Sequence, residues 1–164
     1  MKNRLILIIF IFFLTGCERK PLLDKLSGAK VTETITIDRW GEWVPTHIVL
    51  KSGQTFTVTA TGKINVVFPA GYFADNWEYF YDPSGYQIRF YNGNYYDGQY
   101  YIGGEIIPGE ISGKLYGKIC DSAFGLGSYY ESPAPVGGLL YLAINDFNQG
   151  TIQTGCYTIV VVAE

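Results

Sequence analysis

The chain has 164 residues, enough for one domain with its own core and too few for two of ordinary size. Hydrophobic residues make up 48% and charged residues 16%, which places it among globular proteins. The formal net charge is −3 at pH 7, and this acidic balance argues against nucleic acid as a partner.

The N-terminus has the pattern of a bacterial lipoprotein signal peptide. Lys2 and Arg4 precede an apolar run over residues 5–14, which is too short to span a bilayer. The sequence Leu-Thr-Gly-Cys that ends at Cys17 resembles a lipobox, so we expect cleavage after residue 16 and acylation of Cys17. Several acyl chains, at about 0.8 kcal/mol per buried CH₂, then hold the protein stably on a membrane.

Two alternatives to this lipoprotein are an ordinary cleaved leader, which leaves Cys17 as a spare thiol, and an uncleaved anchor. Removing residues 1–16 removes two bases and no acid, so 10 bases face 15 acids and the net charge becomes −5.

Glu18 after the cysteine favours the outer membrane, where the host has one. Residues 17–30 carry alternating charge and Pro21 and are expected to be a tether in the cell envelope.

Cys120 and Cys156 remain as a pair in an exported, oxidising setting. A disulfide between them would close a separation of 36 residues and would stabilise the fold by about 3–4 kcal/mol on the chain-entropy model. Two buried free thiols are the alternative, and the sequence leaves both open.

Short alternating segments over residues 31–164 predict antiparallel strands. Strands are expected over residues 31–37, 46–50, 55–60, 111–120 and 137–144. The strand at 55–60 is expected to continue over 62–68, and a final strand is expected at the end of the segment 137–162. Residues 121–135 are expected to be a loop, and no run of residues supports a long helix. Short strands separated by glycine-bearing turns indicate an all-β protein, an antiparallel β-sandwich.

An aromatic-rich insertion is expected at about residues 69–109. Thirteen of the thirty residues from 72 to 101 are aromatic, and turn-forming residues occur at 82–85, 92–94 and 97–98. In one interpretation this segment is a sugar-facing platform whose rings, Trp77 and Tyr86 among them, stack on pyranose C–H faces. In the other it is an irregular β insertion whose rings pack on one another and cover a sheet edge.

A polar loop beginning at Asn145-Asp146 joins the last two strands. Oxygen-bearing side chains gather there within nine positions: Asp146, Asn148, Gln149, Thr151, Gln153 and Thr154. Such a loop suits a cation or the hydroxyls of a small ligand, and a solvated hairpin loop is the plainer interpretation.

The second half of the chain resembles a known family. The resemblance is carried, in order, by Pro83-Ser84-Gly85, the segment 113–119, Phe124, Gly127, Pro133, the segment 137–146, Gly155 and the segment 157–161. These residues resemble the PA-IL-type bacterial galactophilic lectins and related galactose-binding-like β-sandwich modules. The resemblance implies a jelly-roll-like sandwich that binds calcium and sugar together at one end.

The resemblance also implies roles for particular residues. Asp146 would ligate calcium and contact the sugar, Phe147 would contact the sugar, and the backbone carbonyl of Val66 would complete the cation shell. Asp82-Pro83 stands where the family has a turn that contacts sugar.

The chain departs from the family in the calcium loop, which is one residue shorter. Ile152-Gln153 replaces a pair of asparagines, and an isoleucine side chain offers no oxygen to a cation that takes six to eight of them. The departure argues against calcium unless Asn148, Gln149 or Thr151 substitutes.

Enzymatic activity is not expected. The only histidine, His47, falls in a predicted strand and is interpreted as a structural imidazole. We therefore expect a lipid-anchored carbohydrate-binding protein whose partner is a glycan or glycoconjugate. The alternative is a surface structural or protein-interaction module that has lost the sugar site and uses its Tyr-rich surface.

Overall fold

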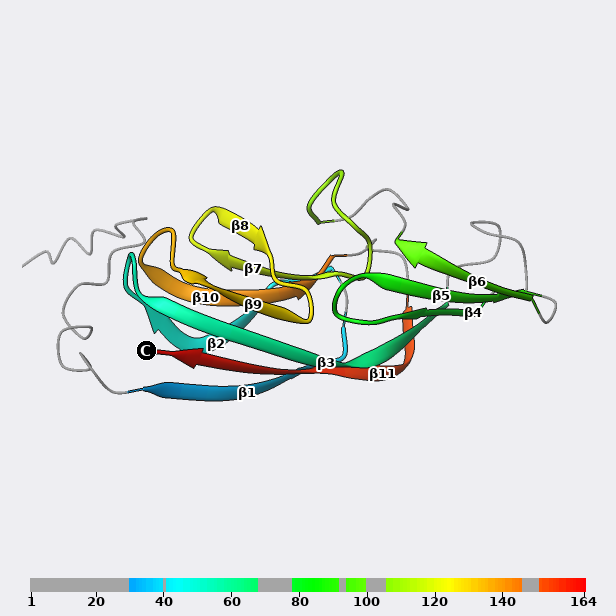
Figure 1. The fold of residues 1–164 in the computed structure, drawn as a ribbon, viewed down its shortest axis with the longest axis horizontal. Coiled ribbons are helices and arrows are strands. Elements are labelled where there is room, and N and C mark those ends of the chain that lie inside the picture. The colour runs from blue at the N-terminus through cyan, green and yellow to red at the C-terminus, as the bar shows by residue number, and fades with distance from the viewer. Residues whose placement is uncertain (1–29, 40, 68–77, 92–93, 100–105, 146–150) are drawn as a thin grey trace, which may run out of the picture.

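The computed structural model describes residues 30–39, 41–67, 78–91, 94–99, 106–145 and 151–164. These residues form eleven strands in two antiparallel sheets packed together (Figure 1). Within these ranges there is no helix, and no helical segment is long and apolar enough to cross a membrane. The all-β sandwich expected from the sequence is confirmed.

The larger sheet has seven strands. Its order is β1 (Val31–Ile37), β11 (Thr151–Ala163), β3 (Thr55–Val67), β4 (Glu78–Tyr81), β5 (Tyr86–Tyr91) and β6 (Asn94–Gln99), and β9 (Tyr129–Pro133) also pairs with β3. The 13-residue strand β3 pairs with β11 along one edge. On its other edge it pairs with β9 near its start and with β4 near its end. This long strand therefore connects the two ends of the molecule.

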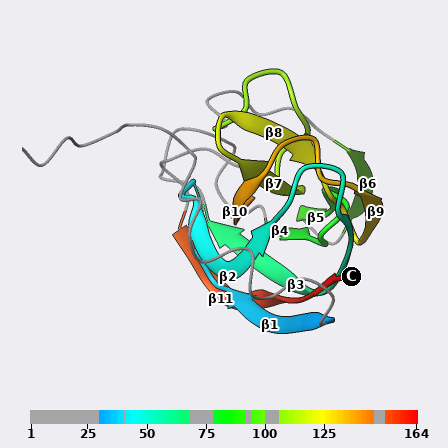
Figure 2. The same ribbon diagram turned by 90° about the vertical axis from the view of Figure 1, so that its left-hand side faces the viewer.

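The smaller sheet has four strands, in the order β2 (Val44–Leu50), β10 (Gly138–Ile144), β7 (Leu115–Ile119) and β8 (Ser122–Gly125). In Figure 2, β7, β8 and β10 lie above β1, β3 and β11, which makes the two layers visible. Alternate residues point into the space between the sheets, as a pleated strand requires. From β3 and β10 these are the buried residues Phe56, Val58, Ala60, Leu140, Leu142 and Ile144.

Three aromatic rings close this core where β8 and β9 meet β3. The ring centroids of Phe124 and Tyr130 are 5.4 Å apart, and those of Phe56 and Tyr130 are 5.6 Å apart. Burying a large apolar side chain contributes about 1.5–3 kcal/mol. The aromatic cluster therefore holds β9 and β8 against the sheets although both strands are short.

Three expectations about the elements are wrong. Residues 121–135 contain β8 and β9 rather than only a loop, and Asp97-Gly98 lies within β6 rather than in a turn. The last two strands do not form a hairpin, because β10 pairs with β2 and β7 whereas β11 pairs with β1 and β3. Both edges of each strand are occupied by other partners, so the connection after Asn145 crosses from one sheet to the other.

The strands of the aromatic-rich insertion extend the larger sheet beyond β3. β4, β5 and β6 pair in sequence as antiparallel neighbours, and the described side chains of Tyr79, Tyr81 and Gln87 are buried. Tyr86 is 38% exposed. Tyr79, Tyr81 and Gln87 therefore pack inside the sandwich, whereas the ring of Tyr86 faces outward.

Cys156 is a free thiol, so the disulfide with Cys120 is not formed. Tyr157 points into the core from β11, and Cys156, one position earlier, therefore points to the opposite face of the larger sheet. Cys120 follows β7 in the smaller sheet. A side chain on the outer face of one sheet cannot meet the Cβ–Cβ distance of a disulfide with the other sheet.

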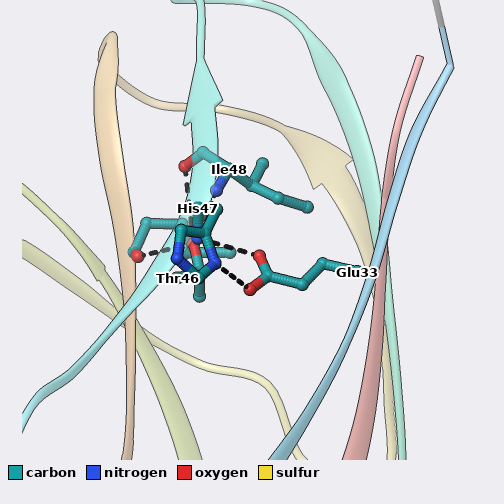
Figure 3. A network of polar contacts seen from close by, with 5 residues as sticks. Glu33, Thr46, His47 and Ile48 are labelled. Atoms are coloured by element: carbon teal, nitrogen blue, oxygen red, sulfur yellow. Dashed lines mark hydrogen bonds and ion pairs between the residues drawn. The ribbon is translucent and has the colours of Figure 1, made fainter.

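His47 lies in β2 but its side chain is 95% exposed. Its Nδ1 is 2.7 Å from Oε1 of Glu33, and its backbone N–H donates to Oε2 of the same carboxylate at 2.8 Å (Figure 3). The His47 ring is therefore exposed and hydrogen-bonded rather than buried. The Glu33 carboxylate that contacts it links β1, at the edge of one sheet, to β2, at the edge of the other.

The two ends of the described chain lie side by side. Val31 pairs with Ala163, and Nζ of Lys30 is 2.8 Å from Oε1 of Glu164. The hydrogen bond from the Lys30 ammonium lowers the pKa of the Glu164 carboxyl.

Candidate functional site

Asn145, the residue before the polar loop, is fully buried and hydrogen-bonded on both atoms of its amide. Its Oδ1 accepts the backbone N–H of Ile107 at 2.9 Å. Its Nδ2 lies 3.2 Å from the carbonyl oxygen of Ile111 and 3.4 Å from that of Ile107. The side chain therefore ties the end of β10 to the segment that precedes β7.

The backbone of Asn145 continues this attachment. Its carbonyl accepts the N–H of Gly113 at 2.7 Å, and its N–H donates to the carbonyl of Lys114 at 2.9 Å. Gly113 has a φ of +76°, and a Cβ placed there would lie 2.2 Å from the ring of Tyr81. Only glycine fits both the left-handed backbone and the close approach of the ring.

The Asp82–Tyr86 turn lies beside this attachment. Oδ1 of Asp82 accepts the N–H of Ser84 at 2.8 Å and that of Tyr86 at 3.2 Å, and the Ser84 hydroxyl donates to it as well. The carbonyl of Pro83, whose side chain is buried, accepts the N–H of Leu115 at 2.9 Å. The turn is thus fixed both internally and to the start of β7.

The hydroxyl of Tyr157 connects the two parts. It lies 2.7 Å from the carbonyl oxygen of Asp82 and 2.9 Å from that of Gly113, and its ring is fully buried in the core. The structure therefore brings together the Asp82–Tyr86 turn and Asn145, two segments about sixty residues apart that the sequence assigned to one ligand site. We call this arrangement of Asp82, Gly113, Asn145 and Tyr157 the junction.

In and beside the junction, three predicted ligand residues have structural roles. The Asn145 amide is used inside the protein, Pro83 is buried, and Oδ1 of Asp82 holds the turn. These contacts favour a positioning role over direct ligand contact. The Tyr86 side chain is exposed, and its hydroxyl donates to Oδ2 of Asp97 at 2.6 Å.

The other predicted site residues are only partly described. Val66 lies in β3, between Ile152 of β11 and Tyr79 of β4. Thr151 and Gln153 lie in β11, but only their backbone is described. Cys17, Trp77, Asp146, Phe147 and Asn148 fall outside the described residues.

Asp146 and Asn148, two of the predicted calcium ligands, lie outside the described residues. Among the residues that the structure describes, no three His, Cys, Asp or Glu side chains converge. The one buried side-chain oxygen in these ranges without a hydrogen-bond partner is Oδ1 of Asn65, which lies next to Val66 on β3.

Comparisons with known proteins define the fold. No protein-family model matches the chain, and no curated protein is similar to it. Among solved structures, the chain is similar to "EclA N-terminal domain; PllA-like lectin", with a TM-score of 0.51 and 18% sequence identity. The similarity covers 81% of this chain and 95% of that one. At this identity it shows a shared fold, so the protein is a β-sandwich with a lectin-like fold.

Two of the four junction residues, Tyr157 and Gly113, are not predicted as site residues from the sequence. Both were assigned to strands, and nothing in the alternation of a strand shows that a buried tyrosine ends on two distant carbonyls. The available signal is chemical. A buried tyrosine hydroxyl needs a hydrogen-bond partner, and backbone carbonyls at the ends of strands, where sheet pairing stops, can accept one.

Proposed function

We propose that the protein is a lipid-anchored carbohydrate-binding protein of the cell envelope, whose site lies at the end of the sandwich marked by the junction. The observation that supports it best is the Tyr157 hydroxyl, which holds the Asp82–Tyr86 turn beside Gly113 and Asn145. The loop that starts after Asn145 therefore leaves from a fixed position next to that turn. Sites that bind small ligands gain affinity from such pre-organised supports.

The lectin-like fold supports the class of ligand, by analogy only, since one fold serves many functions. In the proposed site, the carboxylate of Asp146 accepts sugar hydroxyl protons, and the ring of Phe147 packs on a C–H face. Hydrogen bonds to a charged group contribute about 1.5–3 kcal/mol, so Asp146 would carry a large share of the affinity.

A glycan array on the Cys17→Ser chain tests the proposal, with and without EDTA. We expect binding of neutral glycans. Binding that EDTA removes assigns calcium to the loop residues Asp146, Asn148, Thr151 and Gln153, and binding that survives EDTA excludes calcium. No glycan binding at millimolar concentration in either condition contradicts the proposed function.

Asp146→Ala locates the site. If Asp146 binds the sugar, its loss weakens binding at least about tenfold, the equivalent of one charge-assisted hydrogen bond. Asp121→Ala removes an exposed carboxylate from the turn between β7 and β8 and is the matched control. Equal affinities for both variants would move the site to the aromatic-rich insertion.

A protein-interaction module is the second candidate. The observation that favours it is that Asn145, Asp82 and Tyr86 all use side-chain polar atoms within the protein. In this case the glycan array is blank while the Tyr-rich surface binds a protein partner.

A further inference from the structure

A second exposed feature lies on the outer face of the smaller sheet, where a lysine stands between two aromatic rings. Nζ of Lys118 is 4.7 Å from the ring centroid of Trp43 and 5.5 Å from that of Tyr141. All three side chains are half-buried. We call these residues the Trp43–Lys118–Tyr141 platform.

The platform points away from the core. Leu115 and Ile119 of β7 are fully buried, so Lys118 between them points to the opposite face. By the same alternation Tyr141 of β10 points outward, because Leu140 and Leu142 are fully buried. Lys118 and Tyr141 are direct partners in the β7–β10 ladder, which sets them side by side.

Small residues flank the platform and leave it open. In the register of the sheet, Tyr141 pairs with Pro45 of β2, and Lys118 pairs with Ala123 of β8. Both Pro45 and Ala123 are exposed and neither side chain is long enough to cover a neighbouring ring. The platform therefore presents two half-buried rings and one ammonium on the outer face of the smaller sheet.

The charge of Lys118 is not neutralised by a carboxylate of the described residues. No Asp or Glu among them lies within 4.0 Å of its ammonium. Glu42, next to Trp43 in the chain, instead accepts a bond from Nη1 of Arg39 at 3.1 Å. Among the described residues the ammonium is therefore held by the two ring faces, a weaker interaction than a charge-assisted hydrogen bond to a carboxylate.

We infer that the platform binds a pyranose that carries a carboxylate, that is, a hexuronic acid unit of an acidic polysaccharide. The flat C–H face of such a sugar packs on the exposed parts of Trp43 and Tyr141, and its carboxylate accepts hydrogen bonds from Lys118. This combination of an apolar face and an anion in one rigid ring matches two rings and one cation on one face of the sheet.

The platform is separate from the junction. Tyr141 of β10 precedes Asn145, the residue after the strand, by four residues, about 13 Å at the rise of a strand. It also needs neither calcium nor Asp146. The inference therefore stands or falls independently of the proposed function.

The test uses the full chain in a detergent without sugar groups, with trigalacturonic acid as the probe and its methyl ester as the uncharged control. We expect calorimetry at physiological salt to show binding of the acid and at least about tenfold weaker binding of the ester, since the ester has lost the charge-assisted bonds. Failure of the acid to bind at millimolar concentration, or equal binding of acid and ester, overturns the inference.

Variants assign the binding to the platform. Lys118→Gln is expected to weaken binding of the acid about tenfold, and Lys118→Arg to retain it. Lys63→Gln, which removes an exposed lysine from β3 in the other sheet, is expected to change nothing and controls for net charge. Equal losses in Lys118→Gln and Lys63→Gln would show non-specific attraction and contradict the inference.

Two further arms separate other sources of binding. Asp146→Ala is expected to bind the acid as the parent chain does, and a loss there would place the acid at the loop and overturn the platform. A tetraglutamate peptide is expected to bind at least about tenfold more weakly than the trisaccharide, because it lacks the flat ring face. Equal binding would show a general carboxylate site and refute the sugar assignment.

Discussion

Asn145 is a buried residue whose side-chain amide hydrogen-bonds, among the described residues, to the backbone of Ile107 and Ile111. In the sequence it stands directly before Asp146 and reads as part of one polar ligand motif. In the structure Asn145 has a supporting role, because its side chain fixes the end of β10 to the segment before β7. Such a role is invisible in the sequence, since the residues that satisfy Asn145 lie 34 and 38 positions away.

Asn145→Ala is predicted to destabilise the protein by about 2–3 kcal/mol, because it leaves buried backbone groups of Ile107 and Ile111 without partners. Urea unfolding measures the change. Thr34→Ala, at an exposed position of β1, is the control and should change the free energy of unfolding by less than about 0.5 kcal/mol. A loss as small as this for Asn145→Ala would show that water replaces the amide.

A glycine can be required by a left-handed backbone or by a lack of space for a Cβ, and Gly113 and Gly109 differ in the second requirement. Both have left-handed backbones, with φ of +76° and +81°. A Cβ at Gly113 would meet the Tyr81 ring at 2.2 Å, whereas nothing lies within 4 Å of a Cβ at Gly109. The two positions therefore share the backbone requirement and differ in the steric one.

Gly109→Ala is predicted to cost about 1 kcal/mol, the ordinary cost of a left-handed alanine. Gly113→Ala is predicted to cost at least about 2 kcal/mol more, because the ring of Tyr81 must move within a packed region. Thermal unfolding of the two variants in parallel gives the difference. Equal losses would mean that the Tyr81 ring shifts freely.

At the scale of elements, alternation in the sequence predicts the strands that have one face in the core. β1 covers the seven residues expected of it, and β3 shows the expected inward set of Phe56, Val58 and Ala60. β8 and β9 were missed because their Gly, Ser and Tyr residues also suit turns. They form strands because Phe124 and Tyr130 pack on Phe56.

Pairing was less predictable than the strands themselves. Consecutive strands are usually neighbours in a sheet, which favoured a hairpin of β10 and β11. The competing partners β1 and β3 for β11, and β2 and β7 for β10, come from distant parts of the chain. The candidate site follows the same rule: the resemblance predicts that the Asp82 and Asn145 segments belong together, but it does not predict the Tyr157 and Gly113 contacts that join them.

The Glu33–His47 contact links the edge strands β1 and β2 of the two sheets. Glu33→Ala is predicted to destabilise the fold by about 1 kcal/mol, since it removes the acceptor of both the His47 ring and its backbone N–H. His47→Ala should cost less, because its side chain is 95% exposed and exposed ion pairs contribute little. Chemical denaturation of both variants gives the comparison, and a larger loss for His47→Ala would contradict it.

At the scale of the whole molecule, composition and strand pattern were enough for the fold class, and the similarity to a lectin domain supports it. Membrane attachment rests on the sequence around Cys17 alone. Cys17→Ser is predicted to release the protein from the membrane fraction, because no acyl chain can then be attached. Cell fractionation with immunodetection measures this, with Cys156→Ser as control. Retention of the Cys17→Ser chain in membranes would refute the lipoprotein assignment.

The adjacent ends of the described chain have a consequence for how many copies act together. β1 starts beside Glu164 and ends where Ile37 pairs with Tyr157, six residues or about 20 Å further along. In the proposed lipid-anchored protein the sandwich begins at Lys30, at the far end of β1 from Tyr157, so neighbouring copies on one membrane would present the junction outward. Such an array binds a repeating polymer with avidity, which can exceed single-site affinity by about 10²–10⁴. A site with low affinity would then be sufficient for polymer binding by anchored copies, and a single copy released from the membrane would bind the polymer weakly.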